Sequence, residues 1–183
     1  MSDIEATAKP ILSPMVRGDR ALLSASDQLD VAAWATMKAY IAEYALGEVV
    51  VATKEDRRGL MSNKYPQGAV AVRIGAVERV GIADSVTRIV YRASSEGAPI
   101  GLASCTTFTL GCVALQVCHG LGISIGWTTP SEPRADYVPI YPPCPGEIHW
   151  PPALVLTSSS LAVWERPIPA SDPGGIAAAS DAL

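Results

Sequence analysis

Three arginines in the middle of the chain are the residues whose type and spacing best suit ligand chemistry. Arg73 lies in the segment AVAVRIGAV, and Arg88 and Arg92 lie in SVTRIVYRA. Both segments have the pattern of strands, in which alternate side chains share a face, so we expect the arginines on the more polar face of one sheet. Guanidinium groups bind phosphate and carboxylate through paired hydrogen bonds. The row therefore predicts an anion-binding face, although a solvated face with cross-strand ion pairs is the commoner explanation of such a row.

A second candidate site is a set of aromatic side chains in the proline-rich sequence that follows residue 126. Rigid loops that carry aromatic rings form stacking platforms for nucleobases, and each stacked base contributes about 1–3 kcal/mol. The competing interpretation, which we favour, is that Tyr141 and Trp150 anchor this strand-poor segment to the sheet. The set comprises Trp127, Tyr137, Tyr141, His149 and Trp150.

Neither a metal site nor a catalytic cluster can be assembled from the spacing of the reactive residues. The four cysteines are seven, six and twenty-six residues apart, without a CxxC pair, and His119 and His149 are thirty residues apart. Structural zinc needs closer pairs of ligands. Cys118 adjoins His119, but neighbouring strand residues point to opposite faces. We expect buried, reduced cysteines in a cytoplasmic protein, with no metal, no cofactor and no catalytic activity.

The composition describes one globular domain with an acidic balance. The chain has 183 residues, 49% of them hydrophobic and 17% charged, and a formal net charge of −4. A domain of this length buries about 70% of its unfolded surface without disulfide or metal staples. An acidic chain is not expected to coat nucleic acid or anionic membrane. Residues 54–92 differ, because eight basic and four acidic residues give them a local charge of +4.

A long uncharged stretch, residues 97–131, raises the question of a membrane span. It contains no Asp, Glu, Lys or Arg, but it is interrupted by several glycines, Gln116 and His119. A spanning helix needs about 20 mainly apolar residues, so buried strands fit this stretch better. The N-terminus shows no signal-peptide pattern. We expect no membrane association.

The hydrophobic pattern predicts helices first and strands afterwards. A first helix starts with a capping box of Ser2 and Glu5, and it is expected to kink or break at Pro10 and Pro14. A largely buried helix follows at about 26–46 and a short one from Thr53 to about Met61. The pattern then changes to strands at 69–77, 85–93, 99–108 and 111–120.

The predicted architecture is a single α+β domain at residues 1–166. The N-terminal helices pack on an antiparallel sheet of about four strands. A proline-rich C-terminal segment wraps over the surface because proline lacks the amide donor of a central strand. A final helix is expected at about 157–165, and residues 167–183 are expected to form a disordered tail.

Three cations near the N-terminus receive structural interpretations from the sequence. Lys38 falls inside the apolar helix and is expected to reach solvent through its methylene stem. Arg17 and Arg20 flank Gly18 and Asp19 and are expected to mark an exposed turn.

Four segments, in their order along the chain, carry a family resemblance. KPILSPMVRG followed by DQLDVAAWA, then TTFTLGCVALQV, then YPPCPGEIHWPP resemble the C-terminal region of HNH-endonuclease-like proteins of actinobacteria and their phages. The resemblance covers roughly residues 2–166. In that family the nuclease chemistry lies upstream, in cysteine pairs for zinc and a His/Asn/His cluster that holds the catalytic metal. None of those motifs occurs in this chain, so the resemblance implies a domain that does not cut DNA.

These observations predict a phage-encoded, non-catalytic binding protein that works in the host cytoplasm. It captures an anionic, nucleotide-like small molecule through the sheet arginines and the loop aromatics, and sequestering a host immune signal as an anti-defence protein is one use of such binding. Two alternatives stay open: a DNA-binding or positioning domain of an HNH-type nuclease without its catalytic part, and a protein–protein inhibitor module. We expect a homo-oligomer, since a second subunit often covers an exposed edge strand.

Overall fold

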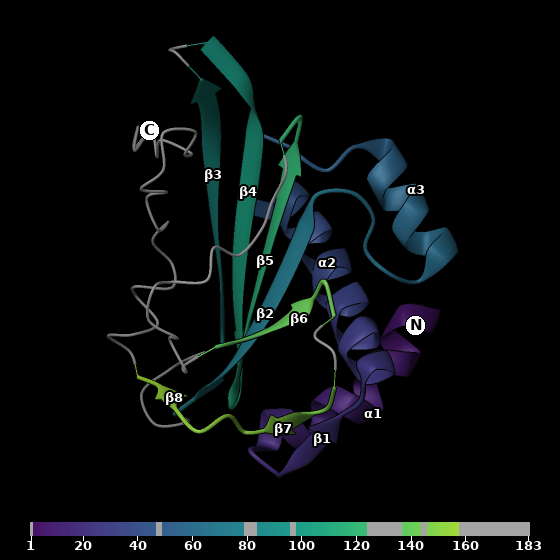
Figure 1. Cartoon of the computed structure of the whole chain (residues 1–183), viewed down its shortest axis with the longest axis vertical. Helices are drawn as coiled ribbons and strands as arrows, with labels where there is room; N and C mark the ends of the chain where they lie inside the picture. Colours follow the sequence, from purple (N-terminus) through teal and green to yellow (C-terminus); the bar gives the residue numbers. More distant parts are fainter. Residues whose placement is uncertain are drawn as a thin grey trace.

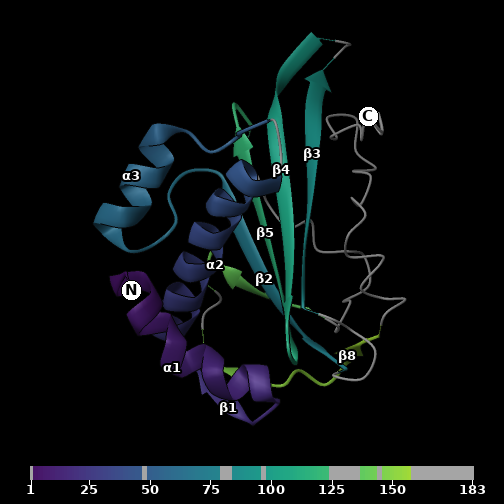
Figure 2. The same cartoon turned by 180° about the vertical axis from the view of Figure 1, so that it is seen from behind.

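A computed structural model describes residues 2–46, 49–78, 84–95, 98–123, 137–143 and 146–157. These residues form a mixed α+β fold in which helices pack on one face of an antiparallel sheet (Figures 1 and 2). The predicted fold class is therefore confirmed. None of the helices in these ranges is long and apolar enough to cross a membrane.

Helix α1 (Asp3–Arg17) begins at the predicted capping box. The Ser2 side chain accepts from the backbone N–H of Glu5, whose carboxylate accepts from the backbone N–H of Ser2. The helix ends at Gly18, whose φ of 85° suits a residue without a side chain.

The prolines were expected to kink or break this helix, and the break does not occur, because α1 continues through Pro10 and Pro14. The two prolines are four residues apart, so the amide missing at Pro14 is the one that would have bonded to the carbonyl of Pro10. Pro10 is exposed, and the opposite stripe of the helix is buried against the core. Packing of that stripe outweighs the local preference to break; the stripe consists of Ile4, Ala8, Leu12 and Met15.

Helix α2 (Ala25–Leu46) is the central helix and packs against both α1 and the sheet (Figure 2). Many of its side chains are buried, as its apolar sequence predicted. Strand β1 (Ala21–Leu23) precedes it, and a short connection leads from it to α3 (Lys54–Asn63). Helix α3 starts at a second capping box, in which Thr53 pairs with Asp56.

Within the described residues the main sheet has six strands rather than about four. Its order is β3-β4-β5-β2-β6, and β8 pairs with β2. The β2–β8 pairing is parallel, and the other pairings of these strands are antiparallel. The two extra strands are β6 and β8. Both are short, and both belong to the proline-rich segment. The strands are β2 (Val70–Val77), β3 (Ser85–Ser95), β4 (Ala98–Leu110), β5 (Val113–Leu121), β6 (Val138–Tyr141) and β8 (Val155–Leu156).

The proline-rich segment is tied to the domain by short strands and buried aromatic rings. Strand β7 (Ile148–Trp150) pairs with β1 to form a separate two-stranded sheet beside α1 (Figure 1). The short strands of this segment agree with the predicted extended path over the domain. The final helix expected at about 157–165 lies, apart from Thr157, outside the described residues, as does the tail expected at 167–183.

The two faces of the sheet differ in what they contact. The helix-facing side carries the main core, in which Val72 of β2 and Val117 of β5 pack with residues of α1 and α2. On the opposite face, Cys105 and Cys118 are cross-strand neighbours and form a disulfide. The expectation of reduced cysteines is therefore wrong for this pair. Cysteine chemistry no longer supports the predicted cytoplasmic location. Alternation along single strands could not place the two sulfurs together, since their contact depends on the β4–β5 register.

Candidate functional site

The predicted row of sheet arginines does not form. Cross-strand pairing places Arg73 opposite Gln116, on the face away from the helices, whereas Arg88 and Arg92 lie on the helix-facing side. Arg73 is only 4% exposed; its Nε donates to Gln116 Oε1 at 2.7 Å, and its guanidinium carbon lies 4.1 Å from the ring centroid of Tyr137. Arg92 is exposed. The expectation of one shared face is wrong because register, rather than position along one strand, decides the face.

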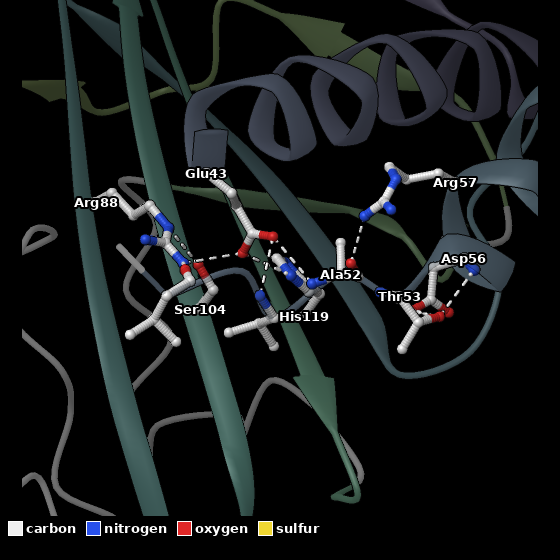
Figure 3. A network of polar contacts seen from close by, with 10 residues as sticks. Glu43, Ala52, Thr53, Asp56, Arg57, Arg88, Ser104 and His119 are labelled. Carbon is white, nitrogen blue, oxygen red and sulfur yellow. Dashed lines mark hydrogen bonds and ion pairs between the residues drawn. The ribbon is translucent and has the colours of Figure 1, made fainter. Parts of the chain in front are cut away.

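Arg88 belongs to a buried polar cluster between α2 and the sheet (Figure 3). Its Nη2 lies 3.0 Å from Oε1 of Glu43, and its Nε donates to Ser104 Oγ at 3.0 Å. The same Nη2 donates to the backbone carbonyl of Val49 at 2.5 Å. The Glu43 side chain is fully buried and that of Arg88 is 5% exposed, so the pair is shielded from solvent.

The second carboxylate oxygen of Glu43 holds the connection between α2 and α3. Oε2 accepts from the backbone N–H groups of Val51 and Ala52, at 3.1 and 2.9 Å. Arg57 of α3 donates to the carbonyl of Ala52 at 2.6 Å, which extends the network (Figure 3). Burial acts to raise the pKa of Glu43, but contacts with His119, the Ala52 amide and Arg88 outweigh it and lower the pKa to about 2.

His119 completes this cluster from strand β5. Its Nε2 lies 3.0 Å from Oε1 of Glu43, within ion-pair distance, and its ring packs edge-on against Tyr40 with centroids 5.2 Å apart. Hydrolytic triads use the same residue types as Glu43, His119 and Ser104, but all three are nearly or fully buried here, and Ser104 Oγ already accepts from Arg88. We interpret the cluster as a clamp that fixes α2 and residues 49–52 to the sheet.

The predicted aromatic platform is divided among different places. Trp150 is 2% exposed and belongs to the main core, and the Tyr141 hydroxyl donates to the carbonyl of Pro66 at 2.8 Å. Both placements agree with the interpretation of these two residues as anchors. His149 is exposed on β7, and Trp127 lies outside the described residues.

A groove of about 560 Å³ between α1 and α2 is the more open candidate site. The end of β4 closes part of it, because Leu110 contributes to its wall. The two helices lie side by side at this point (Figures 1 and 2). The groove is lined by Glu5, Lys9, Leu12, Ser13, Val16, Arg17, Trp34, Lys38 and Leu110.

The polar wall of the groove is positively charged on an acidic chain. The lining of the groove contains three cations, Lys9, Arg17 and Lys38, and one carboxylate, Glu5. Lys38 Nζ lies 2.6 Å from Glu5 Oε1, and this contact lowers the pKa of Glu5, so the carboxylate stays charged and neutralises one cation. Arg17 pairs with Asp19 at 2.9 Å, but both side chains are more than half exposed, so this pair is weak. The groove keeps a positive balance that attracts anions.

The groove also offers apolar and aromatic surface. Trp34 is half-buried on α2, and Lys38 Nζ lies 5.7 Å from its ring centroid. Leu12, Val16 and Leu110 supply aliphatic contacts beside it. Cations next to an aromatic and aliphatic surface can hold a ligand that combines an anionic group with a flat ring.

Sequence reasoning missed this site although the signal was present. Glu5, Lys9, Ser13 and Arg17 recur every four residues, and Trp34 and Lys38 have the same spacing. Residues with this spacing share one side of a helix. The prolines at positions 10 and 14 hide the signal, because on a broken helix Arg17 would be unrelated to Lys9.

Neither the buried cluster around Glu43 nor the α1–α2 groove contains a group of metal-binding side chains among the described residues. Across the ranges that the structure describes, no three His, Cys, Asp or Glu side chains come together in a way that could hold a metal ion.

Known proteins do not add to this picture. No protein-family model matches the chain, and neither a curated protein nor a solved structure matches it. The resemblance to the C-terminal region of HNH-endonuclease-like proteins therefore stays a prediction from the sequence.

Proposed function

We propose that this chain is a non-catalytic binding protein whose α1–α2 groove holds a small anionic ligand with an aromatic ring, such as a nucleotide. The observation that carries the proposal is the presence of three cations and one indole in a single groove of a chain with net charge −4. The ligand class is the one predicted from the sequence, but the site is different. Sequestration of a signalling nucleotide by a phage protein would be one use of such binding.

The cations differ in how freely they can meet an anion. Lys9 is exposed and has no salt-bridge partner within the described residues, so its ammonium group is available to a phosphate. Lys38 is positioned by Glu5 and by the ring of Trp34, which reduces the side-chain entropy lost when a ligand binds. A charged hydrogen bond that a ligand shields from water contributes about 1.5–3 kcal/mol, whereas an exposed one contributes about 0–1 kcal/mol, so affinity depends on how far the ligand covers Lys9 and Lys38.

The two sites predicted from the sequence are less suitable. Arg73 is buried against Gln116 and Tyr137, and Arg88 is bound to Glu43. Freeing either guanidinium would leave a buried group without its partner, which is strongly unfavourable. Arg92 is the one member of the predicted row that is exposed.

Calorimetric titration with AMP, GMP, UMP and inorganic phosphate at low salt tests the proposal. We expect binding of the nucleotides, weaker binding of phosphate, and a loss of at least about tenfold in affinity for Lys9→Ala and for Trp34→Ala. Arg92→Ala is the matched control because it removes an exposed cation outside the groove. A loss of affinity in Arg92→Ala with unchanged binding by Lys9→Ala would place the site on the sheet instead and contradict the proposal.

The same samples test the absence of catalysis. Nucleotides incubated with the protein and Mg²⁺ or Mn²⁺ should be recovered unchanged by chromatography. Hydrolysis of a nucleotide by the folded protein would overturn the non-catalytic assignment.

A further inference from the structure

We infer that the groove takes a short single-stranded nucleotide chain rather than a mononucleotide, an inference that rests on the proposed function. The cations do not converge on one point, as they would around a single phosphate. Lys9 and Arg17 lie at different positions along α1, and Lys38 lies on α2.

The spacing of the cations follows from helix geometry. Lys9 and Arg17 are eight residues apart on a continuous helix, which separates their backbones by about 12 Å. Lys38 lies beside Glu5, a further turn towards the N-terminus, and that carboxylate already neutralises it. One phosphate cannot bridge Lys9 and Arg17, so a mononucleotide would leave one of these two cations without a phosphate.

The phosphates of a nucleotide chain match this spacing. A stacked strand advances about 3.4 Å per phosphate along its axis, so the distance from Lys9 to Arg17 corresponds to roughly three or four steps. A positively charged groove that follows the backbone, together with an aromatic ring on which a base stacks, is the usual arrangement of single-strand binding sites. Trp34 supplies that ring beside the line of cations.

The groove has little means of reading base edges. Its one hydroxyl, on Ser13, donates to the carbonyl of Lys9 at 2.7 Å, and its remaining neutral side chains are apolar or aromatic. Stacking on an indole tolerates any base because every base has a π face. Recognition of the chain should therefore depend on its length and charge much more than on its sequence.

A length series tests this inference. We would titrate 5′-phosphorylated thymidine oligomers of one, two, four and eight nucleotides, and ATP, while following tryptophan fluorescence and calorimetric heat at about 50 mM salt. The affinity should rise at least about tenfold from one to four nucleotides. From four to eight it should change only by the statistical factor for additional binding registers. ATP, whose charges are compact, should bind more weakly than the tetranucleotide.

Salt dependence gives a second, independent readout. Each neutralised phosphate of a single strand contributes about −0.7 to the slope of log affinity against log salt. Lys9 and Arg17, the two cations that Glu5 does not neutralise, therefore predict a slope of about −1.4. Lys9→Ala and Arg17→Ala should each reduce the slope of the tetranucleotide by about 0.7. Arg58→Ala, an exposed cation of α3, should leave it unchanged.

The outcomes separate this inference from the proposed function. Equal affinity for one and four nucleotides, or for ATP and the tetranucleotide, overturns the nucleotide chain and leaves the nucleotide-binding groove standing. Tighter binding of a duplex of about 12 base pairs than of the tetranucleotide also overturns it, since the groove would then follow a duplex backbone. Absence of binding by every ligand removes both. A slope that Arg17→Ala does not change overturns the inference, because the ligand would not span the groove.

Discussion

Replacing Glu43 by glutamine should severely destabilise the fold without changing the shape of the side chain. The carboxylate of Glu43 meets Arg88 and His119 with one oxygen and two backbone amides with the other. The single oxygen of a glutamine amide can accept hydrogen bonds from only one of these two groups of donors. Its NH2 group, itself a donor, would face the other group. Arg88 would retain Ser104 and a backbone carbonyl but lose its buried counter-charge.

The size of the effect can be worked out in two ways. Breaking a buried ion pair by removing one partner costs about 3–5 kcal/mol. The lowered pKa of Glu43, about 2 against an ordinary value of 4.5, reflects the same contacts and corresponds to a stabilisation of the same order, about 3 kcal/mol at neutral pH. These values amount to a large part of the total stability of a typical domain, about 5–15 kcal/mol.

The lowered pKa of Glu43 also makes the stability depend on pH. The pKa of Glu43 is lower in the folded than in the unfolded state, so its stabilisation is complete above about pH 4.5 and is lost as the pH falls towards 2. The difference in unfolding free energy between the natural protein and Glu43→Gln should therefore be constant near neutral pH. It should shrink between about pH 4.5 and 2, because a protonated carboxyl group resembles an amide.

Urea unfolding followed by circular dichroism at several pH values measures both effects. Glu147→Gln is the matched control, since Glu147 is exposed, and it should change the unfolding free energy by less than about 0.5 kcal/mol. Adding Arg88→Met to Glu43→Gln should recover part of the loss, because the unpaired charge is removed. A loss below about 1 kcal/mol for Glu43→Gln, or a loss that stays constant down to about pH 2, would refute the role of the ion pair.

Three further predictions concern the groove and its supports. Glu5→Gln should strengthen binding of anionic ligands about two- to fivefold in titrations, because it releases Lys38 while glutamine can still complete the capping box; weaker binding would contradict the electrostatic account. Gly111→Ala should lower stability by about 1–3 kcal/mol in thermal unfolding, since the residue has a φ of 55° and an added Cβ would collide with the carbonyl of Val16; an unchanged melting temperature would show that α1 can shift. Tyr141→Phe should cost about 1 kcal/mol in urea unfolding by removing one hydrogen bond, and a larger loss would indicate a second role of the hydroxyl.

Local features were predictable from the sequence wherever a few neighbouring residues decide them. The capping boxes of Ser2 with Glu5 and Thr53 with Asp56 were visible as hydroxyl and carboxylate residues three apart, and the helices start there. Alternating apolar residues identified the long strands of the main sheet, and the long apolar helix was placed at about its observed position. Capping boxes and apolar patterns involve residues close together in the sequence, so they can be recognised without knowing which distant segments the element packs against.

The sequence suggested a ligand class but was not used to locate the candidate site, although the four-residue spacing of Lys9, Ser13 and Arg17 was visible in it. The predicted row required Arg73 of β2 to share a sheet face with Arg88 and Arg92 of β3. Which face each side chain occupies depends on the register of the strands that lie between them, β4 and β5. Lys9 and Arg17 stand on one continuous helix because its packing tolerates the two prolines between them. Both errors came from using local preference where packing between elements decides the outcome.

The order of residues is enough to establish that this chain forms an α+β domain, where its first and third helices begin, and that its positive charges are unevenly distributed. Packing between distant segments decides which charges are paired in the interior, as in Glu43 with Arg88, and which line a groove open to solvent. The reason is that a buried charge is stabilised by partners more than forty positions away, and patterns over a few residues carry no information about such distant partners.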